Sequence, residues 1–207
     1  MQITLSNTGK RFNREWIFRH CSYTFNAGRT YAITGPNGSG KSTLLQVIAG
    51  ATLHSEGTIE YKATGGQALI PTEKHYTNIS IAAPYLELIE EMTAKEMLDF
   101  HARFKPLTTT LSIKEILQIV GLENAIDKQI RYFSSGMKQR LKLAQAFFSN
   151  TTILLLDEPT TNLDADGIAL YHRLISNYTK DRLVIVSSNV KQEYDFCEEV
   201  IEIANYK

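Results

Sequence analysis

No long apolar segment occurs in this sequence, and neither sign of charge is in excess. The longest aliphatic run is residues 153–156, whereas a membrane-spanning helix needs roughly 20 apolar residues. We therefore expect no segment that crosses a bilayer. The 22 basic side chains balance the 22 acidic ones, which argues against a strongly basic nucleic-acid binder. We expect no nucleic-acid partner.

Cysteines and targeting signals are also scarce. The two cysteines, Cys21 and Cys197, lie far apart without a metal-binding spacing, which is typical of reduced thiols in the cytoplasm. The N-terminus shows no basic region followed by an apolar region, so we predict no secretory signal peptide. The expected location is the cytoplasm.

What the sequence does contain is an alternation of short strands and helices along a chain long enough for one domain. Apolar periodicity and turn residues predict strands at 3–5, 21–25, 30–34, 57–61 and 67–70, and a helix at 44–49. Two capping boxes, at Thr93 with Glu96 and at Ser112 with Glu115, predict a mostly helical lobe at about 86–135. A helix at 135–148, a strand at 152–156, a helix at 165–178 and a strand at 183–187 follow. This alternation predicts an α/β fold with a mainly parallel sheet.

A glycine-rich loop lies between the predicted strand at 30–34 and the next helix. Residues 35–42 read GPNGSGKS and match the phosphate-loop pattern G-x-x-x-x-G-K-[ST] at every fixed position. Glycines allow the backbone to wrap around phosphates with its N–H groups pointing inward, and the following helix N-terminus favours anions. The candidate nucleotide-binding residues are Gly35, Pro36, Asn37, Gly38, Ser39, Gly40, Lys41, Ser42 and Thr43.

Within this loop the side chains predict different tasks. Lys41 can reach the β and γ phosphates, the Ser42 hydroxyl can bind Mg²⁺, and Thr43 can contact the α-phosphate. This motif alone predicts a P-loop NTPase and nothing narrower.

Two acids follow the most apolar predicted strand. Residues 153–156 are continuously aliphatic, as a fully buried parallel strand is, and Asp157 and Glu158 come directly after them. The carboxyl ends of parallel strands are where open α/β sheets bind ligands. Asp157 can hold Mg²⁺ through water, and Glu158 is placed to polarise an attacking water. We predict that these two carboxylates complete the nucleotide site.

Residues 132–141, YFSSGMKQRL, resemble the LSGGQxxR(L) signature of ATP-binding cassette (ABC) ATPases. Phe133 stands at the leucine position, Ser134 and Gly136 match, and Ser135 and Met137 depart from the pattern. The order of phosphate loop, signature and acidic strand end is also the order of that family. Residues 161–164, TNLD, resemble its D-loop, so the likeness covers nearly the whole chain.

The resemblance implies one nucleotide-binding domain at 1–207. Its fold is a P-loop NTPase core with an N-terminal antiparallel β-subdomain and a small helical subdomain at about 86–135. Two such cassettes meet head to tail around ATP and Mg²⁺, so Ser134 and Gly136 act in trans on the γ-phosphate of the opposite subunit, and Asp164 belongs to the site. Phe12 stands where an aromatic residue stacks on adenine, and Trp16 is an alternative.

Two positions depart from the family pattern. Asn189 stands where a switch histidine is usual, and we assign it to the catalytic set with Glu158 and Lys41, expecting slower hydrolysis because an amide cannot carry a proton as imidazole does. Tyr85 stands where the Q-loop glutamine is usual; Tyr85, Glu87 or water could supply the missing oxygen.

The function that the resemblance implies is ATP hydrolysis that energises transport through a separate transmembrane permease subunit. The ATPase would then lie at the inner face of the cell membrane through that partner, with residues of about 80–100 as the dock, and two identical copies would pair. The alternatives are a non-transport ABC ATPase acting on a macromolecular partner, and a P-loop kinase. The sequence does not name a transported substrate.

Overall fold

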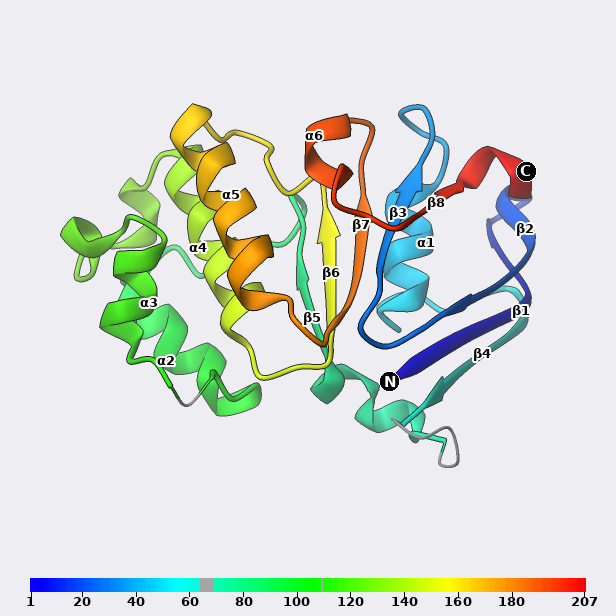
Figure 1. The fold of residues 1–207 in the computed structure, drawn as a ribbon, viewed down its shortest axis with the longest axis horizontal. Helices are drawn as coiled ribbons and strands as arrows, with labels where there is room; N and C mark the ends of the chain where they lie inside the picture. The colour runs from blue at the N-terminus through cyan, green and yellow to red at the C-terminus, as the bar shows by residue number, and fades with distance from the viewer. Residues whose placement is uncertain (64–68, 109) are drawn as a thin grey trace. The chain divides into compact units, whose positions relative to one another are not determined.

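The computed structural model describes residues 1–63, 69–108 and 110–207, apart from the side chains of residues 72 and 73. The chain divides into two compact units (Figure 1). The first unit comprises Met1–Ile81, Thr151–Glu158 and Asp181–Lys207, and the second comprises Ala82–Asn150 and Pro159–Lys180.

The first unit is built on a five-stranded sheet whose paired strands β6, β7, β3 and β8 are parallel. In spatial order its strands are β5 (Ile79–Ala82), β6 (Ile153–Asp157), β7 (Leu183–Ser187), β3 (Thr30–Thr34) and β8 (Glu199–Glu202). Every residue of β6 and β7 is buried. The aliphatic runs therefore form central strands covered on both faces, and the predicted α/β fold with a mainly parallel sheet is confirmed.

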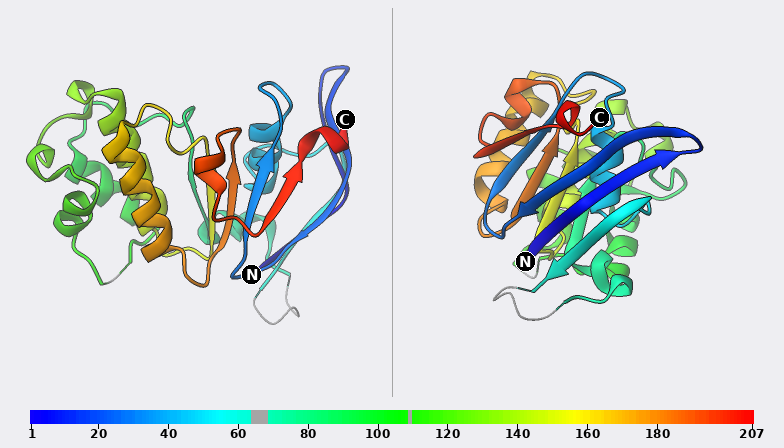
Figure 2. Two further views of the ribbon diagram at one scale, coloured as in Figure 1. Left: turned by 45° about the horizontal axis from the view of Figure 1, so that its top comes forward. Right: turned by 90° about the vertical axis from the view of Figure 1, so that its right-hand side faces the viewer.

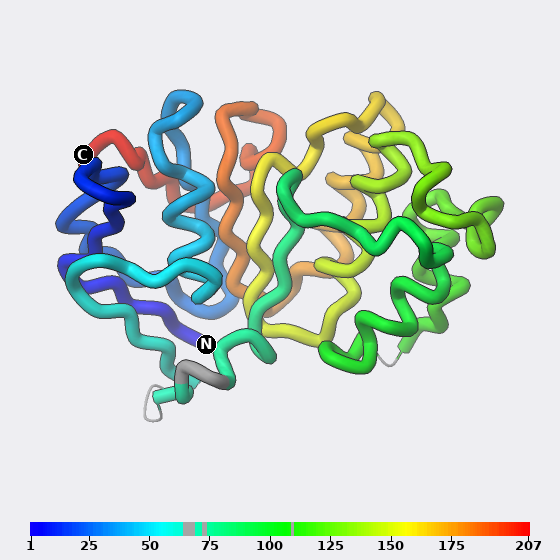
Figure 3. Tube along the Cα trace, turned by 180° about the vertical axis from the view of Figure 1, so that it is seen from behind, coloured from blue at the N-terminus to red at the C-terminus, as the bar shows by residue number. Residues whose placement is uncertain are grey.

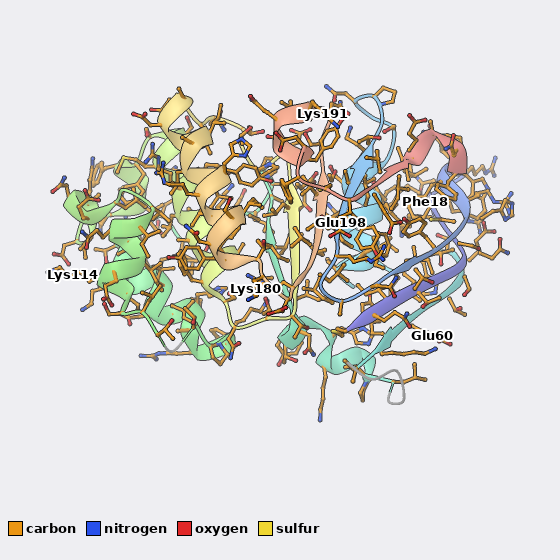
Figure 4. The ribbon with its side chains drawn as sticks, viewed as in Figure 1. Phe18, Glu60, Lys114, Lys180, Lys191 and Glu198 are labelled. Carbon is orange, nitrogen blue, oxygen red and sulfur yellow. The ribbon has the colours of Figure 1, made fainter. Side chains whose placement is uncertain are left out.

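A second, antiparallel sheet in the first unit is formed mainly by the N-terminal part of the chain. Its strand order is β2 (Glu15–Phe25), β1 (Gln2–Phe12) and β4 (Glu56–Lys62), and Figure 2 shows the β1–β2 hairpin from two sides. Helix α1 (Lys41–Ile48) contacts β1 of this sheet and β6 and β7 of the parallel sheet. One apolar core joins the antiparallel sheet, helix α1 and the parallel sheet. Phe18 of β2 is fully buried in this core (Figure 4).

The second unit is helical (Figure 3). Its helices are α2 (Ala94–Phe104), α3 (Ile113–Ile119), α4 (Ser135–Phe148) and α5 (Ala165–Tyr178), with single 3₁₀ turns at Glu123–Ala125 and Ile130–Tyr132. Both predicted capping boxes are present, because Thr93 and Ser112 accept hydrogen bonds from the backbone N–H groups of Glu96 and Glu115. The helical segment predicted at about 86–135 lies inside this unit, which also includes α4 and α5.

Several elements differ from the sequence-based expectation. The N-terminal strands are longer than predicted because Asn13, at a φ of 53°, lets them close into a hairpin. The short helices at Lys191–Tyr194 (α6), Thr72–Asn78 and Ile203–Tyr206 and the edge strand β8 had no sequence signal that we used. The strand predicted at 67–70 lies partly outside the described residues. No helix among the described residues is long and apolar enough to cross a bilayer.

The buried centre of β6 predicts a large stability cost for truncation. Leu155 is fully buried in the core cluster of the first unit, so Leu155→Ala is expected to lower the free energy of unfolding by about 2–5 kcal/mol through lost burial and a residual cavity. Urea unfolding measures the change. Leu53→Ala is the matched control, because Leu53 is 78% exposed; equal effects of the two variants would contradict the assigned core.

Candidate functional site

The phosphate loop connects β3 to α1 in the first unit. Gly35, Gly38 and Gly40 have φ angles of 144°, 75° and 103°, values that an L side chain rarely adopts. Gly40 has a second constraint, since a Cβ atom there would lie 2.5 Å from Ile17 Cγ2 of β2. The glycine pattern therefore reflects both backbone conformation and close approach.

A cavity of about 230 Å³ opens over this loop, lined by Ile17, Asn37, Gly38, Ser39, Gly40, Lys41, Ser42, Thr43 and Glu158. Lys41 is 5% exposed, and its ammonium donates hydrogen bonds to the carbonyls of Gly35, at 2.8 Å, and Pro36, at 3.2 Å. A buried cation and the N-terminus of α1 thus meet at one concave surface. This combination attracts a polyphosphate.

Asp157 ends β6 beside Ser187, the last residue of β7. Its side chain is buried, and neither carboxylate oxygen makes a well-formed hydrogen bond within the described residues. Burial raises the pKa of Asp157, while the nearby hydroxyls of Ser42 and Ser187 and the ammonium of Lys41 offset part of that increase. A buried acid with open coordination positions is suited to bind a hard cation together with the Ser42 hydroxyl.

Glu158 turns the chain out of β6 with a φ of 43°. Its backbone N–H donates to the Ser187 carbonyl at 2.9 Å, and its side chain lines the phosphate-loop cavity. A glutamate in the left-handed region is uncommon, and such strain persists where the surroundings impose it. The structure therefore brings Glu158, Ser42 and Lys41 to the same cavity.

The two candidate adenine-stacking residues differ in surroundings. Phe12, at the end of β1, is 49% exposed, and the Lys10 ammonium lies 4.7 Å from its ring centroid. Trp16 is flanked by Arg19 at 4.1 Å and Arg11 at 5.4 Å. The lining of the phosphate-loop cavity, as far as the structure describes it, includes neither aromatic residue.

A second cavity, of about 430 Å³, lies in the helical unit and contains the signature segment. Ser134 caps α4 by accepting a hydrogen bond from the Met137 N–H at 3.2 Å. A Cβ atom on Gly136 would lie 3.0 Å from the Asn162 carbonyl, so this glycine allows close packing of two loops. Ser134 and Gly136 thus share a polar cavity with Asp164 at the N-terminus of α4.

Asp164 has contacts that sequence reasoning missed. Its carboxylate accepts the Gly167 N–H at 2.8 Å, which caps α5, and pairs with the Arg140 guanidinium at 3.3 Å. The capping hydrogen bond, helped by Arg140, lowers the pKa of Asp164. Asp164 therefore anchors the loop that borders the signature cavity. The signature pattern contains an arginine, and this residue, Arg140, is the sequence signal that could have identified the partner of Asp164.

Other contacts also escaped prediction from the sequence. Ile17 of β2 borders the phosphate loop, and the Lys142 ammonium donates to the Pro84 carbonyl at 2.8 Å beside Tyr85. Asn189 donates from Nδ2 to Asn37 Oδ1 at 2.6 Å. These pairs are far apart in sequence and match no motif, so only the folded chain reveals them.

Comparison with known proteins identifies relatives over nearly the whole chain. The family model described as "ABC transporter" matches residues 18–161. An uncharacterized ABC transporter ATP-binding protein of Bacillus subtilis, YybJ, is 32% identical over 97% of this chain and 92% of its own length. The lantibiotic transport ATP-binding protein SrtF of Streptococcus pyogenes is 28% identical over 96% of this chain and 85% of its own length.

Solved structures show the same fold. A dimeric bacterial ABC transporter cassette superposes with a TM-score of 0.80 at 23% identity, covering 97% of this chain and 93% of that one. A bacterial Atm1-family ABC exporter with ATP bound gives a TM-score of 0.81 at 19% identity, covering 97% of this chain and 37% of that one. The predicted N-terminal antiparallel sheet, parallel core and helical part therefore have known counterparts.

The environment of Asp157 predicts that this residue limits stability in the absence of nucleotide and metal. Its pKa in the folded protein is above the unfolded value, so the ionised carboxylate destabilises the fold, fully so above the folded-state pKa. Asp157→Asn removes that charge and is therefore expected to increase the free energy of unfolding at pH 8, and to increase it by less at pH 4. Urea titrations without nucleotide or Mg²⁺ measure both changes.

The exposed Asp195 supplies the control for this experiment. Asp195→Asn is expected to change the free energy of unfolding at pH 8 by less than about 0.5 kcal/mol, as is usual for a surface substitution. A decrease in stability for Asp157→Asn at pH 8 would contradict the conclusion that the buried charge is costly.

Proposed function

The chain belongs to the ABC transporter family, and we propose that its phosphate loop, Asp157 and Glu158 form the site at which it hydrolyses ATP. It is an ATP-binding subunit, and its ATPase activity energises transport through a separate membrane subunit. The observation that carries the site assignment is the single cavity lined by the phosphate loop and Glu158, with buried Asp157 preceding Glu158 at the strand end.

ATP binding follows from the chemistry of the loop. Backbone N–H groups at the start of α1 and the buried Lys41 ammonium offer positive charge to the phosphates. In this structure the ammonium bonds to the carbonyls of Gly35 and Pro36, which keeps it over the loop. It would exchange these neutral acceptors for phosphate oxygens, which form stronger charge-assisted hydrogen bonds.

Ser42 and Asp157 are the residues that would hold Mg²⁺. The buried carboxylate without a well-formed hydrogen bond and the adjacent hydroxyl are hard oxygen ligands of the kind that Mg²⁺ requires. When bound, Mg²⁺ supplies charge neutralisation at the phosphates. Asp157 would then lose the energetic cost of an unpaired buried charge.

Glu158 is the proposed general base. It lines the cavity in which the phosphates would lie, and its backbone is held to Ser187 at the end of β7. The carboxylate can accept a proton from a water molecule as that water attacks the terminal phosphate. The strained φ of Glu158 directs the chain away from the sheet immediately after Asp157, so the two acids take separate roles.

The signature cavity is proposed to act on ATP bound by a second copy of the chain. Ser134 and Gly136 lie at the N-terminus of α4, where N–H groups favour an anion. ABC ATP-binding subunits dimerise and pair with membrane permeases, and we propose two identical copies arranged head to tail. Arg140 and Asp164 would hold the border of this cavity.

Adenine and membrane contacts complete the proposal. Phe12 is proposed to stack on adenine, because one cation, the Lys10 ammonium, lies over its ring, whereas two guanidinium groups flank the indole ring of Trp16. The permease would dock at residues of about 80–100, which would hold the ATPase at the inner face of the membrane. The matched relatives are transport ATP-binding proteins, which favours a transport role over a non-transport one.

Removing the proposed base tests this function. Glu158→Gln keeps the size of the side chain but cannot accept a proton, so ATP hydrolysis is expected to fall by about 10²-fold or more. Bound ATP should then accumulate, and gel filtration with ATP and Mg²⁺ should show a dimer.

Glu60→Gln provides the matched control, because Glu60 is exposed on β4 of the antiparallel sheet (Figure 4). It should hydrolyse ATP at the parent rate. A Glu158→Gln protein that binds ATP yet remains monomeric would contradict the proposed head-to-tail dimer, and one that retains full hydrolysis would contradict the assigned base.

A further inference from the structure

The segment after β7 is fixed in place by buried hydrogen bonds. Ser188 is fully buried. Its hydroxyl donates a hydrogen bond to the buried Glu193 carboxylate and accepts one from the Val190 N–H at 2.8 Å. Its backbone N–H donates to the Ile33 carbonyl of β3 at 3.1 Å. Asn189 therefore projects from a backbone that is anchored on both sides and tied to the strand from which the phosphate loop begins.

The Asn189 side chain spans from this segment to the phosphate loop. Its Nδ2 donates to Asn37 Oδ1 at 2.6 Å, across 152 positions of sequence. Both residues are exposed, and Asn37 lines the phosphate-loop cavity. A neutral hydrogen bond between exposed groups adds little to stability, so its chief physical effect is to orient the two carboxamides.

Orientation is decisive for a carboxamide beside a phosphate. One end of the group donates two hydrogen bonds and the other end accepts, whereas an ionised phosphate only accepts. If the Asn189 carbonyl oxygen were turned inward, it would face the phosphate oxygens, and these negatively charged atoms would repel each other. Because Asn37 accepts one N–H of Asn189, the amide nitrogen is turned toward the loop and its second N–H is available for an oxygen in the cavity.

The neighbouring cation does not take this task in the structure. Lys191, at the start of α6, places its ammonium 4.9 Å from the Tyr194 ring centroid (Figure 4). That interaction directs it to its own helix. The Asn189 carboxamide is thus the donor of this segment that contacts the phosphate loop.

We propose that Asn37 is a positioning residue that orients the Asn189 carboxamide toward the terminal phosphate of ATP, so that the pair distinguishes ATP from ADP. This proposal rests on the proposed function of the site. It assigns to Asn37 a side-chain role in addition to the backbone role of the loop. ADP lacks the phosphate that Asn189 would contact, so only ATP affinity should depend on the pair.

A double-mutant cycle in the Glu158→Gln background tests the proposal, because hydrolysis is then suppressed. Every protein also carries Gly136→Asp, which disrupts the signature cavity that would hold the nucleotide of the opposite copy, so that the Glu158→Gln background stays monomeric with ATP. Affinities for ATP and ADP with Mg²⁺ are then measured by calorimetry. Asn37→Ala, Asn189→Ala and the double variant are each expected to lose about tenfold in ATP affinity, a typical effect for one hydrogen bond to a charged group. ADP affinity should change by less than about twofold, and the two losses should not add.

The chain provides a control of the same chemistry. Gln2 Nε2 donates to Asn26 Oδ1 at 2.8 Å, which is also a hydrogen bond between two carboxamides. Asn26 precedes β3, whereas the phosphate loop follows β3, so this pair lies at the opposite end of that strand. Asn26→Ala should leave the ratio of ATP to ADP affinity unchanged. If Asn37→Ala folds poorly by circular dichroism, Asn37→Ser replaces it in the cycle.

The remaining outcomes overturn the proposal in distinguishable ways. An unchanged affinity ratio in Asn37→Ala, additive losses, or tighter ATP binding would each refute the positioning role while leaving the proposed function intact. A parent protein that binds neither nucleotide would refute the proposed function, and this inference with it.

Discussion

The burial of both faces of the parallel sheet is the constraint on which the rest of the structure depends. Strands β6 and β7 are buried at every position, so they can carry polar side chains only where they end. Asp157 and Ser187 stand at those ends, side by side in the register of the two strands, and the phosphate loop leaves β3 at the same edge. The core therefore gathers the polar groups of the site at one edge of the sheet.

This arrangement has an energetic cost that the function exploits. Asp157 is buried and makes no well-formed hydrogen bond to any residue that the structure describes, and Glu158 adopts a positive φ. Both features oppose stability in the isolated chain. A nucleotide with its metal would relieve the first of them, so ligand binding and stability are coupled through the same carboxylate. The helical unit shows the contrasting arrangement, in which Ser134 and Asp164 already satisfy helix N–H groups.

Much of the fold could be predicted because its signals are local. Aliphatic runs predicted β6 and β7, capping boxes predicted the starts of α2 and α3, and the glycine pattern predicted the phosphate loop. Strand β8 was missed because it is a short edge strand, EVIE, in which half of the residues are acidic, and its formation depends on pairing with β3. Its stability is tertiary, and periodicity does not detect it.

Within the site, residue types were predictable but pairings were not. Lys41, Ser42 and Glu158 were found from spacing, and the structure brings them to one cavity. The bonds of Asn189 to Asn37 and of Asp164 to Arg140 join segments far apart in sequence, and side chains of these types fit many local roles. Only their juxtaposition shows what each residue does.

We propose that each ATP site is composed of the phosphate loop of one copy and the signature segment of another. The direct measurement is ATP hydrolysis by a mixture of two variants, Lys41→Ala and Gly136→Asp, each tested alone and then combined in equal amounts. We expect little hydrolysis by either variant alone and restored hydrolysis in the mixture, because one of the two sites in a mixed dimer has both halves intact. Hydrolysis by Gly136→Asp alone at the parent rate, or a mixture as inactive as its components, would contradict it.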